Sequence, residues 1–497
     1  MGERGDGGLE RHFGLVQATA LNVIMVVGAG VFITIPYMLL KVPGPLALLG
    51  WLAAGALILV DSLIWSELGA ALPGSGGSYL YLLECYGRRR WGRLMAFLFI
   101  WQFLLSGPLE LASGLIAMDA FSQSLSPQWT AFNEHWGKTF DLWKAQDLSV
   151  TVSPGRLGCV AVGALIIALL YRRVTSLGRL TVLFWLGVLA AVGWILVEGA
   201  LRFDPHKAFD FPDQAARPAD LAWGVGAALA LALYSYLGYY NVCYIGEEVR
   251  DPGRTIPRAV LLSAALVVVL FVAMHLAFLG TVSWREVPPT TEGLKNYSLA
   301  AVFMRRAYGD WAVTLVTLLL MGSCFAAAFG GLLGYSRIPY GAAREGHFFR
   351  AVGRTHPRLH IPHVSLLLVG GLTLAWSFFD LQNVINALIT TRILAQFIAQ
   401  VVGVMLLRKR EPGLRRPFKL WLYPLPCGLA LLGWLYVFVC SEPLYIELGV
   451  LSLLAGVTAF FLWSWRTGGW PFDAAEAPPV PGPFLGPPSE HIQKGGD

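Results

Sequence analysis

Long apolar runs separated by short polar connections make up most of this 497-residue chain. A helix that crosses about 30 Å of hydrocarbon needs roughly 20 residues, and the runs are close to that length. The pattern therefore predicts an all-α polytopic membrane protein with twelve transmembrane helices. The predicted spans are 15–40, 45–71, 94–121, 155–171, 180–200, 222–246, 259–282, 310–335, 363–380, 384–407, 424–440 and 444–465.

Composition and charge agree with helices that are solvated by lipid. Hydrophobic residues make up 56% of the chain and charged residues only 14%, against about 25% charged in an average soluble protein. This balance excludes a soluble globular protein, a collagen-like chain and a disulfide-rich secreted module. The net charge of +6 comes from basic clusters between the apolar runs, such as Arg88–Arg90 and Arg408–Arg410. Such clusters are typical of cytoplasmic loops, so they do not indicate a nucleic-acid partner.

The basic clusters also predict the orientation of the chain. Lys and Arg concentrate on the side that holds both ends, so the positive-inside rule places both termini in the cytoplasm of a multi-pass protein of the cell membrane. The N-terminal segment is then 1–14. The C-terminal tail, 468–497, is rich in Pro and Gly and is expected to be disordered.

The spans divide into two halves of nearly equal length. Spans one to five occupy 15–200 and spans six to ten occupy 222–407. Because five is odd, the second half starts from the opposite side of the membrane, which is the geometry of an inverted repeat. The last two spans, 424–465, follow the repeat.

The first span of each half contains a possible helix break near the middle of the membrane. Gly28, Ala29 and Gly30 interrupt the first span, and the stretch 235–239 interrupts the sixth. A broken helix exposes N–H and C=O groups, so it persists only where it lines a cavity or is buried in protein. The free N–H groups after the first break suit a carboxylate, and the carbonyls at the second suit an ammonium. A single break could simply allow close helix packing, but two at equivalent places favour a receptor for the backbone of an α-amino acid.

Charged residues at mid-membrane depth are costly and are candidates for function. Glu110 and Arg392 lie at similar depths, and we expect them to form an ion pair that acts as an outer gate in the outward-closed state. The alternatives are a static structural pair, two residues that each bond to backbone on separate faces, or Glu110 as a ligand of the substrate side chain. Asp61 either makes an interhelical bond or takes part in coupling. Glu67 and Asp119 lie nearer to span ends, where solvated or capping groups are expected.

Four stretches between the spans resemble the amino acid-polyamine-organocation superfamily, and two of them its L-type amino acid transporter branch. They are 73–79 after the second span, 247–259 after the sixth, 336–347 after the eighth and 416–419 before the eleventh; the last two carry the branch resemblance. The resemblance covers about 10–465. It implies a leucine-transporter-type fold with discontinuous helices one and six, two additional C-terminal helices, and amino acid transport by alternating access.

The resemblance also implies where substrate binds. It places the carboxylate site at the first break, and it places the ammonium site at the second break with Tyr234 as an aromatic lid. Ala29 stands where many relatives have Ser or Thr. Trp185, a gating or coupling candidate, stands where relatives commonly have Lys, so sodium-independent transport is expected. The substrate-binding candidates are Val26, Gly28, Ala29, Gly30, Tyr234, Ser235, Leu237 and Gly238.

The leading hypothesis is a secondary amino acid transporter, either an exchanger or a facilitator. A cationic amino acid or polyamine permease, possibly proton-coupled, is the alternative if Glu110 faces the substrate; a membrane-embedded amino acid sensor is a third reading. The chain contains no H-E-x-x-H, nucleophile-elbow or P-loop motif, so neither an enzyme nor ATP-driven transport is expected.

The cysteines indicate neither a metal site nor a covalent partner. The six cysteines lie singly, without the paired spacing of zinc or redox sites, and no cofactor is expected. The loop 122–154 contains no cysteine. We therefore expect no disulfide-linked heavy chain, which mammalian members of the resembled branch carry at this loop.

Overall fold

A computed structural model describes residues 11, 13–28, 30–74, 76–143, 148–171, 177–213, 217–295, 297–359 and 361–472. Most of the N-terminal segment 1–14 and of the tail 468–497 lies outside this description.

The described chain is an all-α polytopic membrane protein, as the sequence predicts. Eight helices are long and apolar enough to cross a membrane, and a bent pair gives up to nine. Three shorter apolar helices coincide with the remaining predicted spans, so each predicted run is helical, while the number of twelve crossings stays a prediction. The main helices are α1 (Leu15–Val26), α2 (Gly30–Lys41), α3 (Leu48–Ala71), α4 (Ser78–Cys85), α5 (Trp91–Ser122), α7 (Pro154–Tyr171), α8 (Leu177–Leu201), α10 (Pro218–Tyr236), α11 (Pro252–Thr281), α14 (Asp310–Tyr335), α15 (Arg337–Arg344), α16 (His363–Trp376), α17 (Leu381–Arg392), α18 (Ala399–Arg410), α19 (Leu425–Val439) and α20 (Pro443–Thr467).

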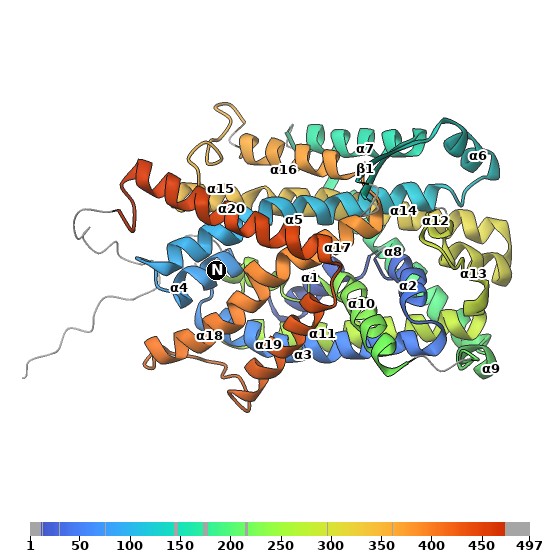
Figure 1. The fold of residues 1–497 in the computed structure, drawn as a ribbon, viewed down its shortest axis with the longest axis horizontal. Coiled ribbons are helices and arrows are strands. Elements are labelled where there is room, and N and C mark those ends of the chain that lie inside the picture. The colour runs from blue at the N-terminus through green and yellow to red at the C-terminus, as the bar shows by residue number, and fades with distance from the viewer. Residues whose placement is uncertain are drawn as a thin grey trace, which may run out of the picture.

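The long helices run side by side along the longest axis of the molecule (Figure 1). α3 packs along α11, and α5 packs along α14 and α17. One end of the bundle, here called the basic end, carries α4, α15 and α18 with the arginines of the 88–90 and 408–410 clusters. The opposite end, here called the loop end, carries α6 (Pro127–Trp136), α9 (Pro205–Ala208), α12 (Thr291–Leu294) and α13 (Leu299–Tyr308).

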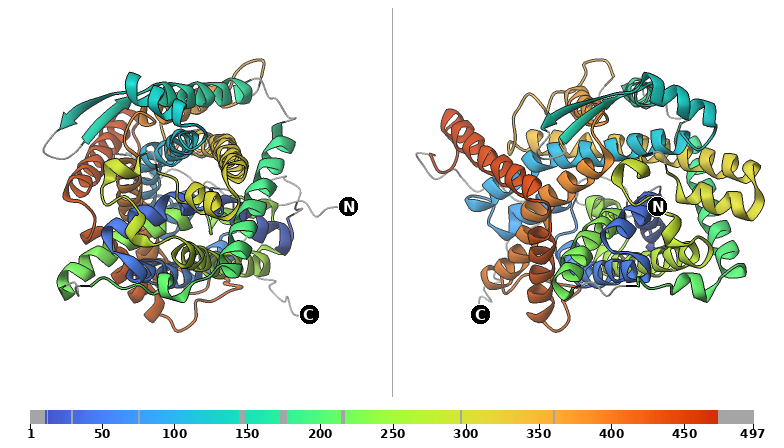
Figure 2. Two further views of the ribbon diagram at one scale, coloured as in Figure 1. Left: turned by 90° about the vertical axis from the view of Figure 1, so that its right-hand side faces the viewer. Right: turned by 45° about the vertical axis from the view of Figure 1, so that its right-hand side comes forward.

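A β-hairpin lies in the loop between α5 and α7, where the sequence analysis predicted no strand. β1 (Lys138–Trp143) pairs antiparallel with β2 (Leu148–Val152). The Thr151 N–H donates to the Phe378 carbonyl at 2.8 Å, and Ser149 Oγ donates to Asp380 Oδ2 at 2.9 Å. The hairpin therefore fastens the α5–α7 loop to the link between α16 and α17; both views of Figure 2 show it projecting from the side of the bundle.

Two carboxylates expected to be solvated or capping groups are buried in ion pairs, so that expectation is wrong. Glu67 on α3 is 1% exposed and binds Arg408 Nε at 2.8 Å, Arg416 Nε at 3.4 Å and the Leu420 N–H at 2.7 Å. Asp119 lies 3.2 Å from Arg156 Nε. The cover comes from the end of α18 and the link before α19 in the case of Glu67, and from the start of α7 in the case of Asp119. Hydropathy along a single span does not reveal such contacts.

The Glu67 cluster predicts a strong effect on stability. Glu67→Gln removes the charge that compensates two arginines, and breaking a buried ion pair typically costs about 3–5 kcal/mol. We expect a clear fall in the thermal unfolding midpoint of the purified protein in detergent. Glu292→Gln is the control, because Glu292 is 82% exposed in its pair with Lys295 and such pairs contribute at most about 1 kcal/mol. Equal midpoints for the two variants would contradict the structural role of Glu67.

Candidate functional site

Both helix breaks are observed, and they lie against each other. α1 ends at Val26 and α2 begins at Gly30, with an angle of 48° between them. α10 ends at Tyr236, slightly later than the sequence suggested, and the chain becomes helical again in the 3-10 helix η3 (Asn241–Tyr244). A Cβ atom placed on Gly30 would lie 3.6 Å from Ser235 Oγ and 3.6 Å from Tyr234 Cε1. Ala29 lies outside the described residues.

Asn22 on α1 satisfies backbone groups that the second break leaves free. Its side-chain Nδ2 donates to the Tyr239 carbonyl at 2.6 Å, and its Oδ1 accepts from the Val242 N–H at 2.8 Å. A third bond, 3.1 Å long, links Nδ2 to Ser263 Oγ on α11. Asn22 is fully buried. The sequence analysis did not single it out, although an amide in the apolar run six residues before Gly28 was the available signal.

Gly238 allows the second break to pack on the end of α1. Its φ of +115° is a conformation that L side chains rarely adopt. A Cβ atom there would also come within 3.2 Å of Met25 Cβ and Val26 Cγ2. Val26 and Leu237 are both buried, so these two candidates contribute packing around the break.

Hydroxyl groups from four helices surround the two breaks. Tyr234 Oη lies 2.8 Å from Ser113 Oγ on α5, and Thr34 Oγ1 on α2 lies 2.9 Å from Ser235 Oγ. A Cβ atom on Gly28 would lie 3.8 Å from Ser323 Oγ on α14. Sequence reasoning missed the hydroxyls of positions 34, 113 and 323, because single Ser and Thr residues are common in apolar spans.

The predicted contact between Glu110 and Arg392 is confirmed. The Arg392 guanidinium is 4% exposed and forms an ion pair with Glu110 Oε2, which also accepts a 2.7 Å hydrogen bond from Tyr335 Oη. The π-helix η6 (Ile393–Ile398) begins immediately after Arg392. Short π-helical insertions in α-helices occur frequently at functional sites.

A cavity of about 450 Å³ opens from the loop end toward the breaks. One wall comes from α2, including Phe32 and Tyr37, and another from α5, including Ile116 and Asp119. Glu110 lies nearer to the basic end than Ile116, by more than one turn of α5. Its pair with Arg392 is thus formed beneath the cavity while the cavity is present. The structure thus places the pair on the basic-end side of the cavity, and its expected role as an outer gate stays a prediction.

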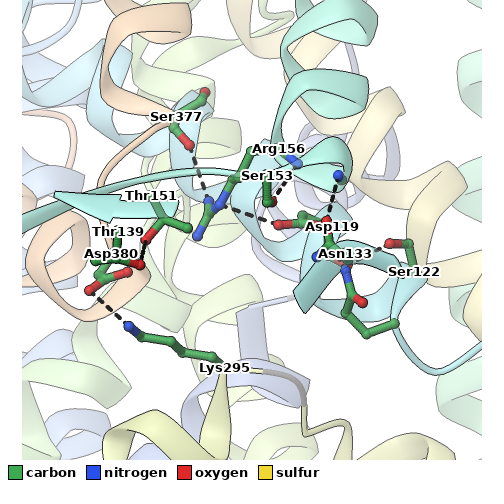
Figure 3. Close-up of polar contacts among 12 residues, drawn as sticks. Asp119, Ser122, Asn133, Thr139, Thr151, Ser153, Arg156, Lys295, Ser377 and Asp380 are labelled. Atoms are coloured by element: carbon green, nitrogen blue, oxygen red, sulfur yellow. Dashed lines mark hydrogen bonds and ion pairs between the residues drawn. The ribbon is translucent and has the colours of Figure 1, made fainter. Parts of the chain in front are cut away.

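Charged side chains line the mouth of the cavity (Figure 3). Arg156 pairs with Asp119 and donates to the Ser377 carbonyl at 3.1 Å. Lys295 lies 3.4 Å from Asp380 and 2.9 Å from Glu292. Burial alone would lower the pKa of the Lys295 ammonium, but the hydrogen bonds and negative charges of these two carboxylates raise the pKa above its usual value.

Asp61 and Trp185 are the remaining candidates, and Asp61 does not line the cavity. Asp61 is buried, accepts a 2.5 Å hydrogen bond from Tyr239 Oη, and accepts a second from Trp434 Nε1 at 3.2 Å. It therefore makes the interhelical bond that was one of its two predicted roles. The side chain of Trp185, on α8, lies outside the described residues.

The fold and the opposed helix breaks define a polytopic membrane protein of the transporter type. The chain belongs to the amino acid permease family, whose model matches residues 13–461, and the resemblance to the amino acid-polyamine-organocation superfamily is confirmed. It is 27% identical to the human cystine/glutamate transporter over 465 residues, which cover 91% of this chain and 85% of that protein. It is 28% identical to the mouse Asc-type amino acid transporter 1 over 475 residues, covering 91% and 81%. It is also 28% identical to the human large neutral amino acids transporter small subunit 2 over 487 residues, covering 93% and 82%.

The space around Gly30 predicts different effects on uptake for Gly30→Ala and Gly30→Val. A single Cβ at 3.6 Å is an ordinary contact, so we expect Gly30→Ala to keep most uptake. The two extra methyls of Gly30→Val must enter the gap between the breaks, and overpacking of about 1–3 kcal/mol corresponds to a loss of about tenfold or more in affinity.

The measurement is uptake of labelled amino acids into proteoliposomes, with insertion of each variant checked by its yield. Wild-type uptake by Gly30→Val would contradict a binding site between the breaks.

Proposed function

We propose that this protein is a secondary transporter that moves amino acids across the cell membrane by alternating access, as an exchanger or facilitator that does not use sodium. The observation that supports this most is the contact of the two helix breaks beneath a cavity. Membership of the amino acid permease family supports amino acids as the substrate class, and it does not suggest catalysis. The inverted repeat of 15–200 and 222–407, followed by 424–465, forms part of the proposal.

The two breaks offer complementary partial charges to a zwitterion. The first N–H groups of α2, from Gly30 onward, begin a helix and have no partner within it, so they carry partial positive charge. The last carbonyls of α10, near Ser235, carry partial negative charge. A substrate carboxylate at the first break and its ammonium at the second would satisfy groups that lipid cannot solvate. Tyr234, held by Ser113, would then cover the substrate.

The substrate side chain is proposed to be neutral. Glu110 is the acidic group nearest to the Tyr234–Ser113 contact along α5, and Arg392 and Tyr335 already occupy its carboxylate. A cationic or polyamine substrate would need that charge to be uncompensated. The name of one relative, which refers to large neutral amino acids, supports the same choice.

We assign the Glu110–Arg392 pair to the floor of the binding site. It lies on the side of Tyr234 that faces the basic end, where the positive-inside rule places the cytoplasm. Opening toward the cytoplasm would require this pair, or the tyrosines around it, to move. The assignment makes α17 and its π-helix the moving part of an inner gate.

No disulfide-linked second subunit is proposed. Five of the six cysteines are buried, in helices or at their ends, where a second chain does not reach them. The name of one relative describes it as a small subunit, but this chain has no cysteine in its α5–α7 loop for a covalent link. A non-reducing gel of the protein from its native membrane tests this.

Transport itself is tested by counterflow. Purified protein in liposomes loaded with unlabelled leucine should accumulate labelled neutral amino acids from outside, at the same rate in sodium and in choline buffers. Gly30→Val is the matched inactive control. A steep dependence on external sodium would contradict the proposed mechanism, and binding without accumulation would favour a sensor.

The floor assignment is tested by a charge swap. Removing either partner leaves a buried charge uncompensated at a cost of about 3–5 kcal/mol, so Glu110→Gln and Arg392→Gln should each reduce uptake strongly. The double variant Glu110→Arg/Arg392→Glu should recover part of it.

If the swap is no better than the worse single variant, and Glu110→Gln alone changes the preference between lysine and leucine, then Glu110 binds the substrate side chain instead.

A further inference from the structure

A second cavity, of about 550 Å³, lies at the basic end of the bundle, far from the helix breaks. It lies between the link that joins α4 to α5 and the end of α18. Its lining residues are Cys85, Tyr86, Gly87, Arg88, Arg89, Arg90, Trp91, Leu406 and Arg410.

The charge of this cavity is strongly positive. Arg88 pairs with Glu84, and Arg410 donates to the Cys85 carbonyl at 3.0 Å. The side chains of Arg89 and Arg90 are exposed, and neither guanidinium group makes a hydrogen bond or ion pair within the part of the chain that the structure describes. Four guanidinium groups therefore line the cavity, and only that of Arg88 is paired with a carboxylate, Glu84. Those of Arg89 and Arg90 keep all their N–H donors available.

Backbone geometry holds one wall of the cavity in place. Gly87 has a φ of +92°, and a Cβ atom there would come within 2.6 Å of the Arg410 guanidinium. Tyr86 Oη donates to the Ala399 carbonyl at 2.8 Å. Because position 87 has no side chain, the Arg410 guanidinium can lie against the backbone beside the cavity. Its positive charge is therefore held in one place.

Apolar side chains complete the cavity on the side where spanning helices begin and end. Trp91, the first residue of α5, is 57% exposed and its ring packs against Trp470 with centroids 5.2 Å apart. Leu406 lies one turn before the end of α18. Exposed tryptophan beside arginine is typical of the boundary between hydrocarbon and headgroups. In Figure 1, α4, α18 and the end of α20 gather at this end of the bundle.

We propose that this cavity binds the phosphate headgroup of an anionic phospholipid. Guanidinium groups grip phosphate oxygens through paired N–H donors, and basic pockets at the cytoplasmic membrane surface are known to hold such headgroups. Trp91 and Leu406 would contact the glycerol and the upper acyl chains. The lipid would link the α4–α5 corner to α18, on which the substrate-site helix α17 continues. The inference does not depend on which substrate is transported.

The test uses the purified full-length protein and native mass spectrometry with phosphatidylglycerol or phosphatidylcholine. The wild type should retain phosphatidylglycerol and not phosphatidylcholine. Each basic residue near an anionic surface strengthens binding about fivefold, so Arg89→Gln/Arg90→Gln should weaken phosphatidylglycerol binding by about 30-fold. The control Arg350→Gln/Arg354→Gln removes the same charge from exposed positions at the same end, outside the cavity, and should bind like the wild type.

Two further measurements distinguish a lipid headgroup from a free phosphate compound and exclude misfolding of the variants. Glycerol 3-phosphate carries the charge without acyl chains, and we expect it not to displace phosphatidylglycerol at equal concentration. Leu406→Glu places a carboxylate in the cavity and should also abolish retention, while the unfolding midpoint without added lipid stays unchanged for both cavity variants. Equal weakening by the control pair, or displacement by glycerol 3-phosphate, would overturn the proposal.

Discussion

Backbone groups that are freed inside a membrane must find partners, and this constraint organises the centre of the molecule. An unsatisfied N–H or C=O in hydrocarbon costs several kcal/mol. Asn22 meets that demand for Tyr239 and Val242, and the contact of Thr34 with Ser235 joins the two broken helices. The N–H groups at the start of α2 and the carbonyls at the end of α10 near Ser235 are the ones proposed to receive substrate. The Asn22 side chain thus binds the backbone groups that serve only the structure of the break, and leaves those proposed to bind substrate.

The helix breaks could be predicted from the sequence because glycines inside an apolar run are a local signal of an interrupted helix. Their surroundings could not, since Ser113 lies 121 residues before Tyr234 and Ser323 comes from a later span, α14, and nothing local distinguishes these serines from packing residues. The pairing of Glu110 with Arg392 was predictable from the cost of isolated charge and from matching depth. The position of the pair relative to the cavity was not, because residue counts from the ends of spans that differ in length and tilt do not give depths on a common scale.

Burial of Glu67 illustrates a different limit of sequence reasoning. A carboxylate near the end of an apolar run resembles a solvated group, and only the return of the chain through Arg416 and Leu420 shows that it is enclosed. The hairpin escaped prediction for a related reason. Its inward face is set by partners at Phe378 and Asp380, more than 200 residues further along the chain. Both cases concern connections between spans, where hydropathy carries little information and tertiary contact decides.

The attachment of the hairpin has a mechanical consequence. β2 is hydrogen-bonded to the residues just before α17, and the buried Arg392 stands at the other end of that helix. A rotation of α17 must either drag the hairpin along or break its bond to Phe378. The hairpin is thus connected through α17 to the buried Arg392. An antibody fragment that binds β1 is therefore expected to hinder movement of α17, and with it transport, without contacting the cavity.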